Sequence, residues 1–84
     1  MEYKYLVQVY VPEIEEEFEF YIPANKHIKF VVDILGQAVN ELEYGSYPKK
    51  SNFQLCNRRT GEVYEYGSYV RNTSIKNGTQ LVLY

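Results

Sequence analysis

The hydrophobic and polar positions of this chain follow two different periods. Residues 4–11 alternate between two faces, as is typical of a half-buried strand. A second alternating run at residues 18–22 lies between the acidic segment at residues 13–16 and Pro23. Proline lacks the N–H that a strand ladder needs, so Pro12 and Pro23 bound the strands. Residues 4–22 therefore predict a β-hairpin.

After Pro23 the apolar positions recur at spacings of three and four, which predicts one amphipathic helix. Its apolar stripe consists of Ile28, Val31, Val32, Leu35, Ala38, Val39 and Leu42. Asn25 and His27 are the candidates for capping its start, and the glycine-containing segment at residues 44–48 is expected to end it. Gly36 inside a helix costs about 1 kcal/mol relative to alanine, so we expect a close backbone contact at that position.

The rest of the chain consists of short apolar segments separated by turn residues. The predicted elements are a strand at 53–56, a turn at 58–61, a brief return strand at 62–64, a short helical turn between Val70 and Ile75, a tight turn at 76–78 and a terminal strand at 80–84. This order is satisfied most simply when the last strand lies parallel beside the first and the helix crosses one face. The expected fold class is α+β, a β-grasp with a mixed sheet of four to five strands, as one domain over residues 1–84.

Composition excludes several classes of function. The chain has 84 residues, too few for a deep enzyme cleft, and 45% of them are apolar. Its single cysteine, Cys56, cannot form an internal disulfide, and its single histidine, His27, leaves no zinc or iron–sulfur ligand set. We therefore expect no metal, no cofactor and a reduced, cytoplasmic protein. Neither a signal peptide nor a membrane span is expected.

The charges are unevenly distributed along the chain. Residues 1–43 hold nine acidic and three basic side chains, whereas residues 44–84 hold two acidic and six basic ones. Solvated turns are the favoured interpretation, and steering of a charged protein partner is the sharper alternative. Nucleic acid is not expected as a partner, because the overall acidity opposes binding to phosphates.

Catalytic and cation-binding interpretations are weak. Cys56 and His27 would need contact and an orienting third group to form a nucleophile and base, yet one is expected on a strand and the other before the helix. The acidic run at residues 13–19 lacks the glycine and the alternating oxygen ligands of a calcium loop. We therefore expect that the protein is not an enzyme.

Three segments of the chain resemble a known family. The strand ending at Ile22–Pro23, the helix face with Val31 and Leu35, and the closing segment 75–83 resemble the ubiquitin layout over nearly the whole chain. Within that superfamily the chain is most similar to the small ubiquitin-like accessory proteins of type VII secretion systems, the EsaB/YukD group of Gram-positive bacteria. The segments that carry this similarity are Val31-Val32-Asp33-Ile34 with Gln37-Ala38, and the Ile75-x-Asn77-Gly78 turn.

One departure from the superfamily bears on mechanism. A conjugated modifier needs a flexible tail that ends in Gly-Gly, because its terminal carboxylate must enter an activating enzyme. This sequence stops at Tyr84, on the predicted terminal strand. We therefore expect noncovalent recognition, while a conjugated modifier with a longer native chain is a third hypothesis.

Strand parity identifies a candidate recognition surface. The side chains expected on the sheet face away from the helix are Leu6, Tyr10, Tyr21, Gln54, Cys56, Val82 and Tyr84. Of these, Leu6, Gln54, Val82 and Tyr84 are expected to lie near one another, where the resemblance to ubiquitin places the main apolar recognition patch. Arg58, Arg59 and Arg71 are expected at its margin. An uncovered apolar patch indicates a protein partner, with scattered surface apolar residues as the alternative.

Two functional hypotheses follow. The leading one is a noncatalytic ubiquitin-like protein-binding module, an accessory or regulatory factor of a type VII secretion system. The alternative is a small structural β-grasp subunit of a multicomponent enzyme complex. For partners we expect another protein, and we leave a weak homo-oligomer open.

Overall fold

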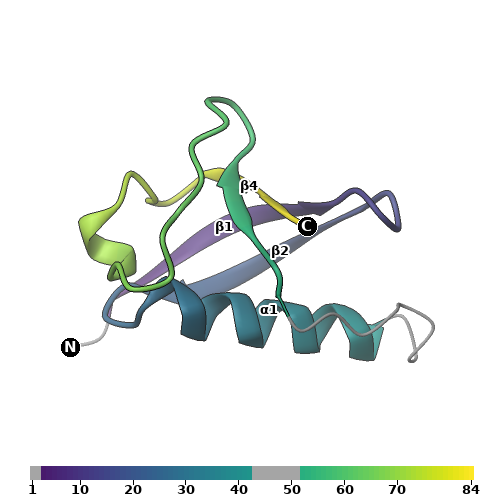
Figure 1. Cartoon of the computed structure of the whole chain (residues 1–84), viewed down its shortest axis with the longest axis horizontal. Coiled ribbons are helices and arrows are strands. Elements are labelled where there is room, and N and C mark those ends of the chain that lie inside the picture. The colour runs from purple at the N-terminus through teal and green to yellow at the C-terminus, as the bar shows by residue number, and fades with distance from the viewer. Residues whose placement is uncertain (1–2, 43–51) are drawn as a thin grey trace.

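The computed structural model of this chain describes residues 3–42 and 52–84. Its elements in chain order are strand β1 (Lys4–Val11), strand β2 (Glu16–Pro23), helix α1 (Ile28–Leu42), strand β3 (Leu55–Asn57), the 3-10 turn η1 (Val70–Asn72) and strand β4 (Gln80–Leu83). The four strands form one sheet in the order β2-β1-β4-β3. Figure 1 shows α1 lying across one face of this sheet. The expected α+β grasp fold is confirmed, with a sheet of four strands.

The amino-terminal hairpin forms where the alternating pattern predicts it. β1 and β2 pair antiparallel along their full length, from Lys4 opposite Pro23 to Val11 opposite Glu16. The connecting turn is closed by two backbone bonds, in which the Ile14 N–H donates to the Val11 carbonyl and the Glu15 N–H to the Pro12 carbonyl. Because apolar residues alternate with polar ones in both strands, this register puts the apolar members of each pair on the same face.

The last strand completes the sheet beside the first. β4 pairs parallel with β1 and antiparallel with β3, so it occupies the centre of the sheet. The turn before it contains Gly78 at a φ of 87°, a conformation that glycine adopts without steric cost. The Gly78 N–H donates to the Leu6 carbonyl, and the Asn77 side chain accepts the Leu6 N–H. The predicted Asn77-Gly78 turn therefore also anchors β4 to β1.

The core lies between the sheet and α1. Its buried side chains include Val7, Val9 and Val11 of β1, Ile28, Val31, Val32, Leu35 and Val39 of α1, and Leu55, Leu81 and Leu83 of the carboxyl-terminal strands. Phe18 and Phe20 of β2 pack against this cluster while remaining half-buried. In β1 from Val7 onward and in β4, the residues that alternate with the predicted outward-facing ones are thus buried.

The start of α1 is held by a loop from the second half of the chain. The Ile28 N–H donates to the Ser68 carbonyl at 2.9 Å, and the Lys29 N–H donates to the Tyr66 carbonyl at 3.1 Å. These bonds satisfy two of the donors that a helix leaves open at its amino end. His27 occupies the cap position, since its carbonyl accepts the Val31 N–H, and its ring stacks on Tyr69 at 4.2 Å. The expected helix stop at residues 44–48 lies outside the described residues.

The segment around β3 contains less regular structure than the sequence predicts. The strand predicted at 53–56 is β3 at Leu55–Asn57, although Gln54 and Tyr84 still exchange two backbone bonds. The prediction of a return strand at residues 62–64 is wrong. The segment forms a single bridge between Val63 and Cys56. The Asn57 side chain explains this, because its Oδ1 accepts the N–H groups of Arg59 and Thr60 and holds a tight turn that leaves little length for pairing.

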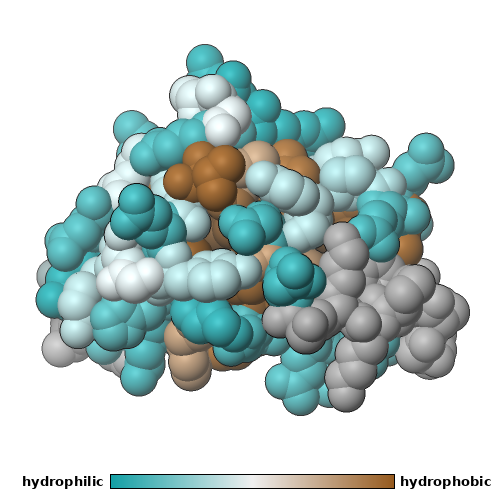
Figure 2. All heavy atoms as spheres, viewed as in Figure 1, coloured by the Kyte–Doolittle hydropathy of each residue, from teal (hydrophilic) through white to brown (hydrophobic). Residues whose placement is uncertain are grey.

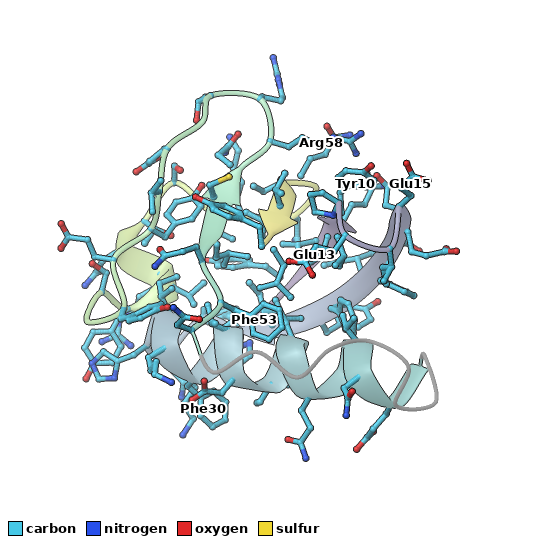
Figure 3. All side chains as sticks on the ribbon, turned by 45° about the vertical axis from the view of Figure 1, so that its right-hand side comes forward. Tyr10, Glu13, Glu15, Phe30, Phe53 and Arg58 are labelled. Carbon is cyan, nitrogen blue, oxygen red and sulfur yellow. The ribbon has the colours of Figure 1, made fainter. Side chains whose placement is uncertain are left out.

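Gly36 has the close contact that the sequence predicts. A Cβ atom at this position would lie 2.6 and 2.8 Å from two ring carbons of Phe53, which is 7% exposed. Figure 3 shows the Phe53 side chain between α1 and the sheet. The glycine therefore gives the aromatic ring room against the helix backbone.

Gly36→Ala is accordingly expected to destabilise the fold by about 1–3 kcal/mol, because overpacking against Phe53 outweighs the gain of about 1 kcal/mol in helix propensity. Urea unfolding monitored by circular dichroism measures the change. Gly67→Ala is the matched control, because nothing lies within 4 Å of its Cβ position. A Gly36→Ala variant as stable as the wild type would contradict the packing argument.

Candidate protein-binding surface

The sheet face away from α1 contains a continuous row of side chains that crosses all four strands. Tyr10 of β1 pairs with Glu17 of β2 on one side and with Val82 of β4 on the other. Val82 pairs in turn with Cys56 of β3, and Cys56 forms the isolated bridge with Val63. We call these five residues the outer row. Since residues directly opposite one another in a sheet share a face, the outer row presents one connected surface.

Tyr84 and Gln54 extend the outer row toward the end of β4. Their backbones exchange two hydrogen bonds, of which the Tyr84 N–H to Gln54 carbonyl bond is 3.0 Å long. The Tyr84 side chain is 39% exposed and forms a side-chain hydrogen bond with Cys56. Burial raises the pKa of the Cys56 thiol above its ordinary value, and this hydrogen bond opposes the rise. Cys56 is thus a half-buried, neutral packing residue of the surface.

Arg58 crosses this surface instead of lying at its margin. Its guanidinium carbon lies 4.7 Å from the centre of the Tyr10 ring, and its Nη1 donates to Glu17 Oε2 at 2.6 Å. Figure 3 shows Arg58 and Tyr10 on the same side of the molecule, away from the helix. The Arg58 and Glu17 side chains are 41% and 45% exposed, so their ion pair contributes about 0–1 kcal/mol. Arg58 therefore covers part of Tyr10 with a contact that is weak enough to rearrange.

Leu6 does not join this group, and the proximity predicted for it is wrong. In the parallel register of β1 and β4, Gln8 is opposite Gln80 and Tyr10 is opposite Val82. Leu6 is four residues before Tyr10, which corresponds to about 13 Å along the strand. Between them lies a polar pair in which Gln80 Nε2 donates to Gln8 Oε1 at 3.3 Å. The physical reason is register, because parity places Leu6 on the correct face but says nothing of its position along the sheet.

The other two predicted arginines have different positions. Arg59 lies in the turn after β3 and lines a polar hollow of about 600 Å³ together with Ser74 and Lys76. Arg71, on η1, lies with its guanidinium carbon 4.8 Å from the Tyr69 ring centre, and its N–H donates to the Ala24 carbonyl. Arg71 therefore contacts the stacked rings of His27 and Tyr69 at the start of α1. Its predicted position at the margin of the apolar recognition patch is wrong.

Val63 is a member of the surface that the sequence analysis missed. Its side chain is 52% exposed, next to Cys56 on the face away from the helix. Carrying strand parity across the predicted turn at 58–61 would have placed it there. Tyr21 of β2, which is 70% exposed, lies on the same face opposite Leu6. On the side of the molecule that Figure 2 presents, brown apolar groups are interspersed with teal polar ones.

The residues weighed for catalysis are in different places. His27 stacks on Tyr69 at the start of α1, whereas Cys56 is on β3 and bonded to Tyr84. Among residues 3–42 and 52–84, no three of His, Cys, Asp and Glu are grouped as metal ligands would be. Within the same residues, no helix has the length and apolar character required to cross a bilayer.

Comparisons with known proteins identify the fold. No protein-family model and no curated protein matches the sequence. Among solved structures, the ubiquitin-like domain of EccD5 from Mycobacterium xenopi is 18% identical with a TM-score of 0.79, covering 98% of this chain and 93% of that one. A chain of the MycP5-free ESX-5 inner membrane complex is 20% identical with a TM-score of 0.79, covering 96% of this chain and 20% of that one.

The similarity extends beyond these two structures. A ubiquitin-like domain of an Arabidopsis thaliana protein is 18% identical with a TM-score of 0.63, covering 96% of this chain and 76% of that domain. The chain spans only a fifth of the length of its ESX-5 neighbour, so the likeness concerns one domain of that protein. The antiparallel hairpin, the crossing helix and the parallel pairing of β4 with β1 are the β-grasp features of this chain. The chain has the ubiquitin-like β-grasp fold, and its structural neighbours include the ubiquitin-like domain of EccD5 and a chain of the ESX-5 inner membrane complex.

Proposed function

We propose that this chain is a noncatalytic ubiquitin-like module that binds a protein partner noncovalently through the outer row and Tyr84. The observation that carries the proposal is the continuity of Tyr10, Val82, Cys56 and Val63 across the sheet face that the helix leaves uncovered. Aromatic side chains and arginine dominate the binding energy of protein interfaces. The sheet face away from the helix supplies an aromatic residue and an arginine, because the Arg58 guanidinium stacks on the Tyr10 ring.

The charges around this surface favour a protein partner. Glu17 lies at one end of the outer row, and Arg58 reaches over it from the β3 side. Opposite charges flanking an apolar centre influence the orientation and rate of association more than they add affinity. The ion pair between them can exchange for contacts with a partner, because it is exposed and weak.

The pathway we propose is type VII secretion, with an accessory or regulatory role on the cytoplasmic side. The similarity to the EccD5 domain and to a chain of the ESX-5 complex supports this proposal. The Val31–Ile34 and Ile75–Gly78 segments support it from the sequence. We take residues 1–84 as one such domain. A second copy of the chain is a weaker candidate partner for the same surface.

Photo-crosslinking tests the proposed surface. A benzoylphenylalanine replaces Val63 in one version of the protein and Asn72 in the control, since both side chains are exposed and Asn72 lies on η1. Each version is produced in cells of the organism from which the sequence comes, and the cells are illuminated. We expect discrete protein adducts from position 63 and none from position 72. Mass spectrometry of the adducts identifies the partner and tests the pathway. Adducts from position 72 with none from position 63 would contradict the proposal.

A further inference from the structure

β2 is an open sheet edge eight residues long. Within the described part of the chain its one strand neighbour is β1. The Ala24 N–H donates to the Tyr3 carbonyl, so these two residues form a hydrogen-bonded pair. In an antiparallel ladder, hydrogen-bonded and non-hydrogen-bonded pairs alternate along the two strands. The backbone N–H and C=O groups therefore point toward β1 at Ile22, Phe20 and Phe18. They point away from β1, to the open edge, at Tyr21, Glu19 and Glu17. Unpaired donors and acceptors on an edge strand form a template for one more strand.

An apolar groove runs beside this open edge, on the helix side of the sheet. Its volume is about 240 Å³, and its lining includes Phe20 and Ile22 of β2 and Phe30, Ile34 and Leu35 of α1. Phe30 and Ile34 are 42% and 44% exposed. Figure 3 shows Phe30 on the side of α1 away from Phe53. Because drug-sized ligands occupy larger pockets, of roughly 300–1,000 Å³, this groove suits individual side chains of a peptide.

The charges along β2 determine what kind of strand the edge accepts. Glu17 and Glu19 lie on its outer face, and Glu19 has no ion-pair partner among residues 3–42 and 52–84. At the other end of the groove, Lys4 and Lys26 line its walls. Pairing with β2 of a second copy would bring these glutamates against one another, and like charges on paired strands are destabilising.

From these observations we infer that β2 and its groove bind an extended peptide segment of a protein partner as a fifth strand. The segment alternates apolar residues, which face Phe20 and Ile34, with basic residues, which face Glu17 and Glu19. An acidic residue lies at its amino end, near Lys4. We assign the antiparallel direction, which is slightly more stable per residue than the parallel one. In this mode backbone bonds supply affinity and alternate side chains supply specificity.

The inferred pairing defines a probe peptide, acetyl-Asp-Val-Thr-Ile-Lys-Val-Lys-amide. Its residues lie opposite Pro23 through Glu17 in order, so its first Val and its Ile face the groove beside Ile22 and Phe20. Its two Lys lie opposite Glu19 and Glu17. Titration of the isotope-labelled protein, followed by amide NMR, is expected to shift β2 and the first half of α1 in a saturable manner.

N-methylation of single peptide bonds tests the strand pairing itself. The N–H of the Lys opposite Glu19 points at β2, whereas the N–H of the Ile opposite Phe20 points to solvent. Methylating the first is expected to weaken binding about tenfold or more, and methylating the second about twofold or less. Two methylated peptides that bind equally well would overturn the inferred pairing, whatever their affinity.

Protein variants test the groove and the charges. Ile34→Ser and Glu19→Gln are each expected to weaken peptide binding by about threefold or more, while Glu65→Gln, an exposed glutamate in a loop, leaves it unchanged. All three positions are exposed, so amide spectra of the free variants check that the fold is kept. An absence of saturable shifts, or shifts centred on Val82 and Cys56, would overturn the inference. Crosslinking from position 63 tests the outer surface independently, so the two proposals fail separately.

Discussion

Leu81→Ala is expected to remove about 2–5 kcal/mol from the free energy of unfolding. Leu81 is fully buried in β4, the central strand that pairs with both β1 and β3. Its neighbours in the register are Val9 and Asn57, so the truncation leaves a cavity where the sheet meets the core. A domain of this size has a total stability of about 5–15 kcal/mol, which makes this a large fraction of it.

Val82→Ala is the matched control for Leu81→Ala. Val82 follows Leu81 directly but faces away from the helix, where its side chain is half-buried. Partial burial of two carbon atoms corresponds to about 1 kcal/mol or less. Urea unfolding of the two variants measures the difference between the faces of one strand. Equal losses at Leu81 and Val82 would contradict the assignment of inner and outer faces.

Periodicity predicted the long elements of this fold accurately. The bounds of β1 and α1 follow the change from period two to period 3.6, because each element buries a repeating set of side chains against the other. Gly36 was also predictable, since a glycine within a helix has an energetic cost that close packing explains. The Asn77-Gly78 turn has the positive φ that its residues indicate.

The short elements were harder to predict from sequence. The 62–64 segment has a β-like composition, but the Asn57 side chain tightens the preceding turn and one bridge to Cys56 is all that forms. The start of α1 depends on the carbonyls of Ser68 and Tyr66, about forty residues away in sequence. Interactions over such separations leave no local pattern in the chain, so the sequence does not predict the strand and helix ends there.

The candidate surface was predictable as a face but not as a patch. Parity placed Tyr10, Val82 and Cys56 on one side of the sheet, and the structure agrees. The pairing of β1 with β4, however, sets which residues are neighbours, and it separates Leu6 from Tyr84. The position of Arg58 over Tyr10 depends on a side-chain conformation that sequence patterns do not describe.

Val82→Glu is expected to weaken partner binding by about 30-fold or more, which corresponds to 2 kcal/mol. Val82 is at the centre of the outer row, between Tyr10 and Cys56, where a bound partner would exclude water. A carboxylate that loses water there without a matching charge destabilises the complex. Gln37→Glu is the matched control, because it introduces the same charge at an exposed residue of α1, on the other side of the sheet and outside the groove beside β2.

The affinity of the crosslinked partner for these two variants tests the proposed binding surface most directly. The partner is purified after its identification, and isothermal titration calorimetry compares wild type, Val82→Glu and Gln37→Glu, each checked by circular dichroism to be folded. We expect Val82→Glu to lose about 30-fold or more in affinity and Gln37→Glu to bind the partner within about threefold of the wild type. Wild-type affinity for Val82→Glu, or a loss confined to Gln37→Glu, would contradict binding through the outer row.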